Sequence, residues 1–261
     1  MKYYAVSDIH SFYTPLVNAL QAAGFFDDKE EHKLVVCGDL LDRGSEPTEV
    51  QNFICDLIDK DEVILIRGNH EDLMVDMLKD LEELLLRGDL AYSHYEHNGT
   101  VKTFLEMTGV TRMSLFRNTE KQIDRMVRLP FFTKILPKMR DFYETDNYIF
   151  VHGWIPCREA VETLGYYNES ANGPWREADR HAWWCARWFS YLDAMNTGKI
   201  PEKTIICGHR SAAYGHAVAK DIMPGENEEA EKYRPFYGNG FIAIDGCTVR
   251  SGIVNCLVIE D

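Results

Sequence analysis

The chain has 261 residues, of which 45% are hydrophobic and 27% are charged, and its formal net charge is −14. This length allows one sizeable hydrophobic core, alone or with an inserted cap. An acidic surface of this size repels polyanions and anionic lipids, so the charge argues against non-specific nucleic-acid binding and against docking on membranes.

The first 67 residues alternate between short apolar runs and helical patterns, each ended by glycine or proline. In chain order they predict a strand at Tyr3–Ser7, a helix from Thr14 to Gly24, a strand at Lys33–Cys37, a helix from Ser45, and a strand at Val63–Arg67. This order is typical of an α/β sheet with parallel crossovers.

The middle of the chain is mostly helical in pattern, and we expect residues 75–140 to form a helical cap or insert within one domain of residues 1–261. The remaining predicted elements are a helix at Glu71–Arg87, strands at Tyr148–His152, Thr204–Gly208, Phe241–Ile244 and Ile253–Ile259, a tryptophan-rich helix at Pro174–Asn196, and a loop at Gly225–Lys232.

The seven cysteines are odd in number and none are at C-x-x-C spacing, which argues against a disulfide framework or a zinc knuckle. An acidic residue at Asp8 leaves no room for a signal-peptide core, and no apolar stretch is long enough to span a bilayer. We therefore expect a cytoplasmic protein with no membrane partner.

Polar side chains gather where the predicted strands end. Strand ends deliver Asp8 and His10, the Asp39–Gly44 turn, Asn69 and His70, His152, and His209. Singly, each has an ordinary explanation, such as a helix cap, a turn or a core histidine. Together they predict a ligand site, because ligands bind at the carboxyl ends of strands in α/β sheets.

Carboxylate, amide and imidazole groups in one place suit a pair of divalent cations. Two ions about 3.5–4 Å apart can clamp a phosphoryl group and generate a nucleophilic hydroxide near neutral pH. Mixed nitrogen and oxygen ligands favour manganese, with iron or zinc as alternatives.

The ordered motifs D-x-H, G-D-x-x-D-R-G, G-N-H-E, H-G and G-H resemble those of the calcineurin-like metallophosphoesterases. The endings of the second and third motifs are most similar to the phosphoprotein phosphatase branch, which includes serine/threonine phosphatases and symmetrical diadenosine tetraphosphate hydrolases. The resemblance runs from residue 4 to about residue 257, but residues 75–140 match nothing in it. It implies an α/β fold in which a β-sandwich is flanked by helices (αββα), with metals at the sheet edge.

The resemblance also implies roles for individual residues. Asp8 and His10 would hold one metal, Asp39 would bridge, and Asn69, His152 and His209 would hold the second. His70 would protonate the leaving group with Asp42 as its charge partner, and Arg43 would clamp phosphate oxygens.

The family uses a second arginine between its last two histidines, for which Arg158, Arg176, Arg180 and Arg187 are candidates. We favour Arg187 because aromatic neighbours can hold it rigidly, although it could equally be a surface charge on a core helix. Arg210 is a weaker candidate. Trp183, Trp184 and Trp188 could stack on an adenine, but tryptophans at this spacing are more often core.

Two residues depart from the family pattern at positions that we expect on the rim of the site. Ser11 stands where glycine is usual, and Trp154 replaces a small residue. We assign none of the histidines outside the motifs to the site: His32, His94, His97, His181 and His216.

The function these residues favour is hydrolysis of phosphate monoesters by metal-bound hydroxide, as in serine/threonine phosphatases. The alternative is a symmetrical dinucleoside polyphosphate hydrolase, so the partner is a phosphoprotein or a nucleotide. A polynucleotide phosphatase is disfavoured by the acidic charge. A non-catalytic metal-binding scaffold is disfavoured because it would not need Arg43 or His70.

Overall fold

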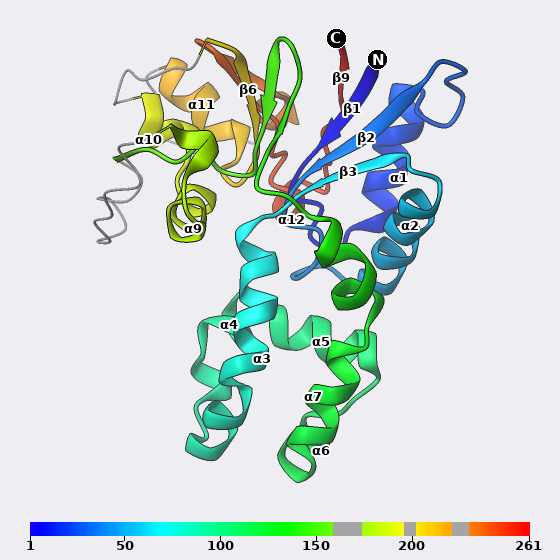
Figure 1. The fold of residues 1–261 in the computed structure, drawn as a ribbon, viewed down its shortest axis with the longest axis vertical. Helices are drawn as coiled ribbons and strands as arrows, with labels where there is room; N and C mark the ends of the chain where they lie inside the picture. Colours follow the sequence, from blue (N-terminus) through cyan, green and yellow to red (C-terminus); the bar gives the residue numbers. More distant parts are fainter. Residues whose placement is uncertain (159–173, 196–201, 221–229) are drawn as a thin grey trace.

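Two β-sheets lie face to face in the computed structural model, which describes residues 1–158, 174–195, 202–220 and 230–261 (Figure 1). The first sheet has the order β3-β2-β1-β9, built from β1 (Lys2–Val6), β2 (His32–Cys37), β3 (Val63–Ile66) and β9 (Leu257–Glu260). The second has the order β4-β5-β6-β8-β7, built from β4 (Tyr143–Glu144), β5 (Tyr148–Phe150), β6 (Thr204–Cys207), β8 (Phe241–Ala243) and β7 (Phe236–Gly238).

Neighbouring strands are parallel at the centre of each sheet. In the first sheet β1 pairs in parallel with β2 and β2 with β3, while β9 runs antiparallel to β1. In the second sheet β5, β6 and β8 are parallel, and β4 and β7 are antiparallel at the edges. Parallel strands end at the same edge, so the loops that follow them meet there.

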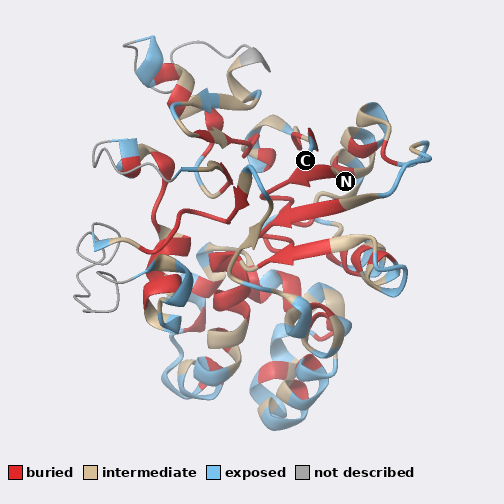
Figure 2. Ribbon diagram, turned by 45° about the horizontal axis from the view of Figure 1, so that its top comes forward, coloured by how far each residue is buried: buried red, intermediate tan, exposed pale blue. Residues whose placement is uncertain are grey.

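The central strands β1, β2, β3, β5, β6 and β8 are mostly apolar and largely buried (Figure 2). Ala5 and Val35 of the first sheet pack against Phe150 and Ile206 of the second. Alternate residues, such as Val6, face the helices on the outer side instead. The two inner faces therefore form the centre of the sandwich.

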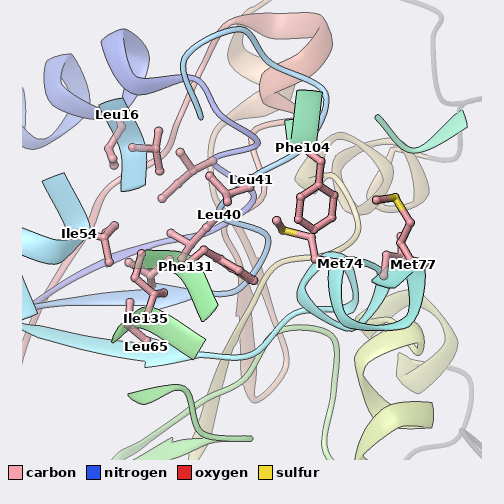
Figure 3. Close-up of a cluster of buried hydrophobic side chains, with 14 of the residues drawn as sticks. Leu16, Leu40, Leu41, Ile54, Leu65, Met74, Met77, Phe104, Phe131 and Ile135 are labelled. Carbon is pink, nitrogen blue, oxygen red and sulfur yellow. The ribbon is translucent and has the colours of Figure 1, made fainter. Parts of the chain in front are cut away.

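Helices α1 (Tyr13–Ala23) and α2 (Pro47–Asp59) cover the outer face of the first sheet (Figure 1). Their apolar faces contribute Leu16 and Ile54 to a core that also holds Leu65 and Phe131 (Figure 3). Helices α9 (Arg180–Trp188), α10 (Tyr191–Met195) and α11 (Ala212–Ala219) accompany the second sheet. The observed architecture is the expected sandwich between helices.

The segment 75–140 is mostly helical, as expected, and extends away from the sheets (Figure 1). It is entered through α3 (Asn69–Arg87), and the elements that follow are η1 (Leu90–Tyr92), α4 (His94–His97), α5 (Thr100–Thr108), α6 (Arg112–Arg117), α7 (Thr119–Val127), η2 (Phe131–Ile135) and η3 (Leu136–Lys138). Met74, Met77 and Phe104 join the same core as the first sheet (Figure 3). This cap is thus continuous with the core of the sandwich.

The predicted helix at Pro174–Asn196 is wrong in its continuity. The structure has η5 (Trp175–Glu177), α9 and α10, and Asn196 lies outside the described residues. Asp179 begins α9 because its carboxylate accepts from the Ala182 N–H at 2.8 Å. Phe189 ends α9 because its backbone is extended, with φ −85° and ψ 151°.

Two further boundaries differ from prediction near the C-terminus. The strand expected at Ile253–Ile259 begins only at Leu257, after the short helix α12 (Thr248–Ser251). The expected loop at Gly225–Lys232 ends in η6 (Ala230–Tyr233), and its residues 225–229 lie outside the described part. None of the helices in the described ranges combines the length and apolar character that crossing a bilayer requires.

Candidate metal centre

The loops after β1, β2, β3 and β6 meet at one pocket of about 400 Å³. Five of the six predicted ligands line it: Asp8, His10, Asp39, Asn69 and His209. The sixth, His152, is buried behind the pocket, with its Nε2 3.4 Å from Asp39 Oδ1. The structure therefore brings together all six side chains that the strand ends predicted.

The loops that carry these residues are strained. Asp8, His10, Asp39, Asp42 and His209 have φ between 49° and 73°, a left-handed conformation that side chains other than glycine seldom adopt. Each such residue costs roughly 1–3 kcal/mol, and such residues cluster at functional sites. The sharp turns aim the side chains at a common point.

Two glycines allow the loops to approach one another. A Cβ atom on Gly68 would lie 2.2 Å from Asp39 Oδ1, and one on Gly208 would lie 2.2 Å from Asp8 Oδ2. Both contacts are far shorter than real Cβ contacts, so only glycine fits. The G-N-H-E and G-H motifs thus need their glycines for room.

At one end of the pocket, His10 faces two carboxylates. Its Nδ1 donates to the Leu41 carbonyl at 3.1 Å, so its Nε2 carries the lone pair and acts as an acceptor. That Nε2 lies 3.7 Å from Asp39 Oδ2 and 4.0 Å from Asp8 Oδ1. The other oxygen of Asp39, Oδ1, lies 3.4 Å from His152 Nε2, so this carboxylate contacts both ends of the pocket, as its predicted bridging role requires.

At the other end, His152 faces oxygen atoms although its Nε2 carries no proton. Its Nδ1 donates to the Cys37 carbonyl at 2.8 Å, so its Nε2 carries a lone pair. This Nε2 lies 2.8 Å from Asn69 Oδ1, and His209 Nδ1 lies 3.0 Å from the same oxygen. Electron-rich atoms converging in this way attract a cation, so the donor set fits a divalent metal.

Burial disfavours the ionised form of the carboxylates at the centre of the site. It raises the pKa of Asp8, with Asp245 as the next cause, and it raises the pKa of Asp39, with Asp8 as the next. Burial also raises the pKa of Asp245 to about 6. Positive charge placed among these carboxylates would favour their ionised forms.

The histidines are held in the neutral form that binds metals. Burial lowers the pKa of His10 and His152 well below the ordinary value, and that of His209 to about 4. A metal therefore need not displace a proton from them near neutral pH.

His70 lies between a carboxylate and a guanidinium. Its Nδ1 donates to Asp42 Oδ2 at 2.8 Å, and Arg43 Nη2 donates to its Nε2 at 2.9 Å. The other arm of Arg43 donates to His10 Nε2 at 2.9 Å. His70 also forms a possible ligand group with His10 and Asp39, beside the group of Asp8, Asp39 and His152. The geometry thus admits His70 as proton donor or as ligand.

Arg187, which we favoured as the second arginine, does not line the pocket. Its Nε donates to Asp72 Oδ2 at 2.6 Å and its Nη1 to Asp141 Oδ1 at 2.7 Å. The side chain is buried, and the two carboxylates balance its charge. Arg187 therefore joins α9 to the first turn of α3, which carries Asn69 and His70. Arg158, Arg176 and Arg180 do not line the pocket either.

The tryptophans divide between core and pocket. Trp154 is buried against Phe241, so the expectation that it shapes the rim is wrong. Trp183 is also core, as expected, and stacks on Phe142 with ring centroids 5.4 Å apart. Trp188 lines the pocket with its ring 6.0 Å from that of His209.

The sequence did not single out several residues at the site. Asp245 and Arg250 line the pocket from the segment around α12. His97, which we assigned to no site from the sequence, lines it from the cap. Glu71 is fully buried and accepts from the N–H groups of Gly68, Asp39 and Leu40. The fourth position of G-N-H-E was an available signal for Glu71, and Asp245 directly follows the strand predicted at Phe241–Ile244. Nothing local marks His97 or Arg250.

Known proteins share both this fold and parts of the sequence. A family model described as calcineurin-like phosphoesterase matches residues 1–224. A bis(5'-nucleosyl)-tetraphosphatase PrpE [asymmetrical] from Bacillus velezensis is 34% identical over 85 residues, covering 30% of this chain and 34% of that protein. The chain thus matches about a third of the length of this curated relative.

Solved structures of protein tyrosine phosphatases are similar in fold. The cold-active enzyme of a psychrophilic Shewanella species aligns with a TM-score of 0.51 and 18% identity, covering all of this chain and 75% of that one. Another structure of a cold-active protein tyrosine phosphatase gives 0.51 and 19%, covering 99% and 73%. At these identities the likeness shows the fold alone.

Proposed function

Because the chain belongs to the calcineurin-like phosphoesterase family, and is therefore a metal-dependent hydrolase, we propose that it cleaves phosphate monoesters with two divalent cations. The observation that supports this proposal is that five of the six proposed ligands line one pocket together with Arg43, while His152, His70 and Asp42 lie in direct contact with these residues or with one another.

The proposed ligands fall into two sets that share one carboxylate. Asp8, His10 and Asp39 would hold one cation, and Asp39, Asn69, His152 and His209 the other. We propose manganese, with iron or zinc as alternatives, because nitrogen and oxygen ligands are mixed. When bound, the cations neutralise phosphate charge and activate a water molecule.

Two arginines would bind the phosphate. Arg43 already presents both arms of its guanidinium to nitrogen acceptors in the pocket, and phosphate oxygens fit the same fork. We propose Arg250, in place of Arg187, as the second arginine, because it lines the pocket. Its side chain is exposed, so its guanidinium can meet an anion that enters the pocket.

His70 would protonate the oxygen of the departing alcohol. An alkoxide leaves poorly, and proton transfer from a positioned side chain contributes roughly 10²–10⁴-fold in rate. Asp42 accepts from Nδ1, which orients the ring and supports a positive charge on it. The pocket volume of about 400 Å³ is large enough for a phosphate and part of an alcohol.

A symmetrical dinucleoside polyphosphate hydrolase is the second candidate. Trp188, Val249 and Arg250 all line the pocket, which gives it an aromatic side chain, an apolar side chain and a cation. A nucleobase and a second phosphate could use that surface. The relative named as an asymmetrical tetraphosphatase supports a nucleotide substrate, although it matches only part of this chain.

We propose a cytoplasmic, reducing location, because none of the seven cysteines, all of which lie in the described ranges, forms a disulfide.

The test is turnover of three substrates by the manganese-loaded protein: a phosphoserine peptide, p-nitrophenyl phosphate and diadenosine tetraphosphate. Hydrolysis of both monoesters supports the first proposal. Cleavage of the dinucleotide alone into two diphosphates would establish the alternative. His70→Asn should reduce turnover of the phosphoserine peptide at least about a hundredfold with metal content unchanged, and an unchanged rate would remove His70 from the mechanism.

A further inference from the structure

The cap reaches back to the loop that carries Arg43. Gly99 has φ +87°, and a Cβ atom there would lie 2.7 Å from the Arg43 backbone nitrogen. Lys102 Nζ donates to the Gly44 carbonyl at 3.0 Å. His97, three residues before α5, lines the pocket itself. Residues 97–102 therefore form a wall that touches the catalytic loop directly.

Thr100 connects this wall to the proposed proton donor. It is the first residue of α5, and it is fully buried, like Asp42. Its hydroxyl donates to Asp42 Oδ2 at 2.7 Å, and the same oxygen accepts from His70 Nδ1 at 2.8 Å. Two donors from different parts of the chain thus meet on one carboxylate oxygen.

The other oxygen of Asp42 does not help to orient the carboxylate. Asp42 Oδ1 is buried and has no hydrogen-bond partner among the residues that the structure describes. Asp42 also has a left-handed backbone, with φ 73°, in a strained loop. The rotation of its side chain is therefore fixed by His70 and Thr100. His70 is itself the ring that Asp42 orients, so Thr100 is the one other described group that fixes the carboxylate.

We propose that Thr100 is a positioning residue that fixes Asp42 so that Asp42 can orient His70 as a proton donor. This inference rests on the proposed function, in which His70 protonates the leaving alcohol. It makes the cap part of the site, because α5 supplies the hydroxyl that holds Asp42, and through Asp42 the ring of His70, in position. Donation from the hydroxyl also stabilises the ionised carboxylate in its buried position.

The kinetic test compares two leaving groups. Thr100→Val keeps the shape of the side chain and removes only the donor. With a phosphoserine peptide, whose alkoxide needs a proton, kcat should fall about tenfold, since general-acid catalysis supplies roughly 10²–10⁴-fold. With p-nitrophenyl phosphate, whose phenolate leaves without one, kcat should stay within about twofold. Thr100→Ser should restore the rate on the peptide.

Thr108→Val is the matched control. Thr108 is also buried on α5, but its hydroxyl donates to the Phe104 carbonyl within the same helix. It should leave the ratio of the two rates unchanged. Equal losses on both substrates in Thr100→Val, no loss on either, or a Thr100→Ser variant as slow as Thr100→Val would each overturn the proposal.

A second measurement separates this proposal from the proposed function. If the wild-type protein turns over neither ester, the proposed function fails, and the nuclear magnetic resonance signal of the His70 Nδ1 proton decides the link. Its chemical shift should change in Thr100→Val and return in Thr100→Ser. An identical shift in all three proteins would show that Thr100 does not act on the pair.

Discussion

Glu71 should be essential for the geometry of the metal centre although it holds no metal in the proposed mechanism. Its Oε2 accepts from Gly68 N at 2.7 Å and Asp39 N at 3.0 Å, and its Oε1 accepts from Leu40 N at 2.9 Å. These bonds fasten the loop after β2 to the first turn of α3. Glu71→Gln must turn its amide group toward at least one of these N–H donors.

The cost of that change follows from the contacts. The better orientation of the glutamine keeps the two bonds of Oε2 and loses the bond from Leu40, and a hydrogen bond to a charged group is worth roughly 1.5–3 kcal/mol. Burial raises the pKa of Glu71, so removing its charge offsets part of the loss. We expect a net destabilisation of about 2 kcal/mol, or roughly 4–8 °C in Tm for a chain of this size.

The assay is thermal unfolding of the metal-free protein, together with kcat of the manganese-loaded protein. A shift of Asp39 or His70 by about 1 Å could cost up to a hundredfold in rate, so kcat should fall at least about tenfold. Glu82→Gln, an exposed position on the same helix, is the control and should change neither quantity. A Glu71→Gln protein with wild-type Tm and kcat would refute the reasoning.

Three further predictions concern the rest of the site. Arg250→Ala should raise KM for a phosphate monoester about tenfold, whereas Arg117→Ala, far out on the cap, should not; equal KM values would exclude Arg250 as a phosphate ligand. Arg187→Met should lower the free energy of unfolding by about 3 kcal/mol because it breaks a buried ion pair with Asp72. Arg176→Met breaks a half-exposed pair with Glu144 and should lower it by less than about 1 kcal/mol. Similar losses in the two variants would contradict this prediction. Burial raises the pKa of Asp8 and Asp39, so in the metal-free protein the folded state keeps protons on these carboxyl groups that the unfolded chain releases. The metal-free protein should therefore lose stability as the pH rises above the ordinary carboxyl pKa. Manganese needs the ionised carboxylates, so its stabilising effect on Tm should be larger at about pH 7.5 than at about pH 5, and the reverse order would contradict this.

The strand-end residues could be predicted because their signals are local. A short apolar run followed by Asp8 or by Gly68 and Asn69 shows both the strand and the turn within a few residues. Parallel pairing then places these turns at one edge of the sheet. The proposed metal ligands could therefore be selected from pattern and chemistry together.

The walls of the pocket could not be predicted in this way. His97 and Arg250 reach it from the cap and from the segment after β8, and no local pattern shows which way those segments fold back. The position of Arg187 outside the pocket could not be predicted for a related reason. An arginine among aromatic residues suits a phosphate or a carboxylate equally, and its partner Asp72 lies 115 residues earlier in the chain.

The prediction of one continuous helix over residues 174–196 was wrong because capping residues divide a segment whose apolar periodicity is continuous. Aromatic and apolar residues recur at helical spacing across the whole segment, but Asp179 begins a new helix and Phe189 interrupts it. Capping groups satisfy backbone donors at each break, so the chain can turn and cover the second sheet.

The most direct test of the central claim is the number of metal ions bound per chain, measured by calorimetric titration of manganese into the metal-free protein. Two ions should bind to the wild-type chain, and Asp39→Asn should weaken both because this carboxylate lies next to His10 on one side and His152 on the other. Binding of fewer than two ions by the wild-type chain, or unchanged binding in Asp39→Asn, would contradict a shared two-metal centre.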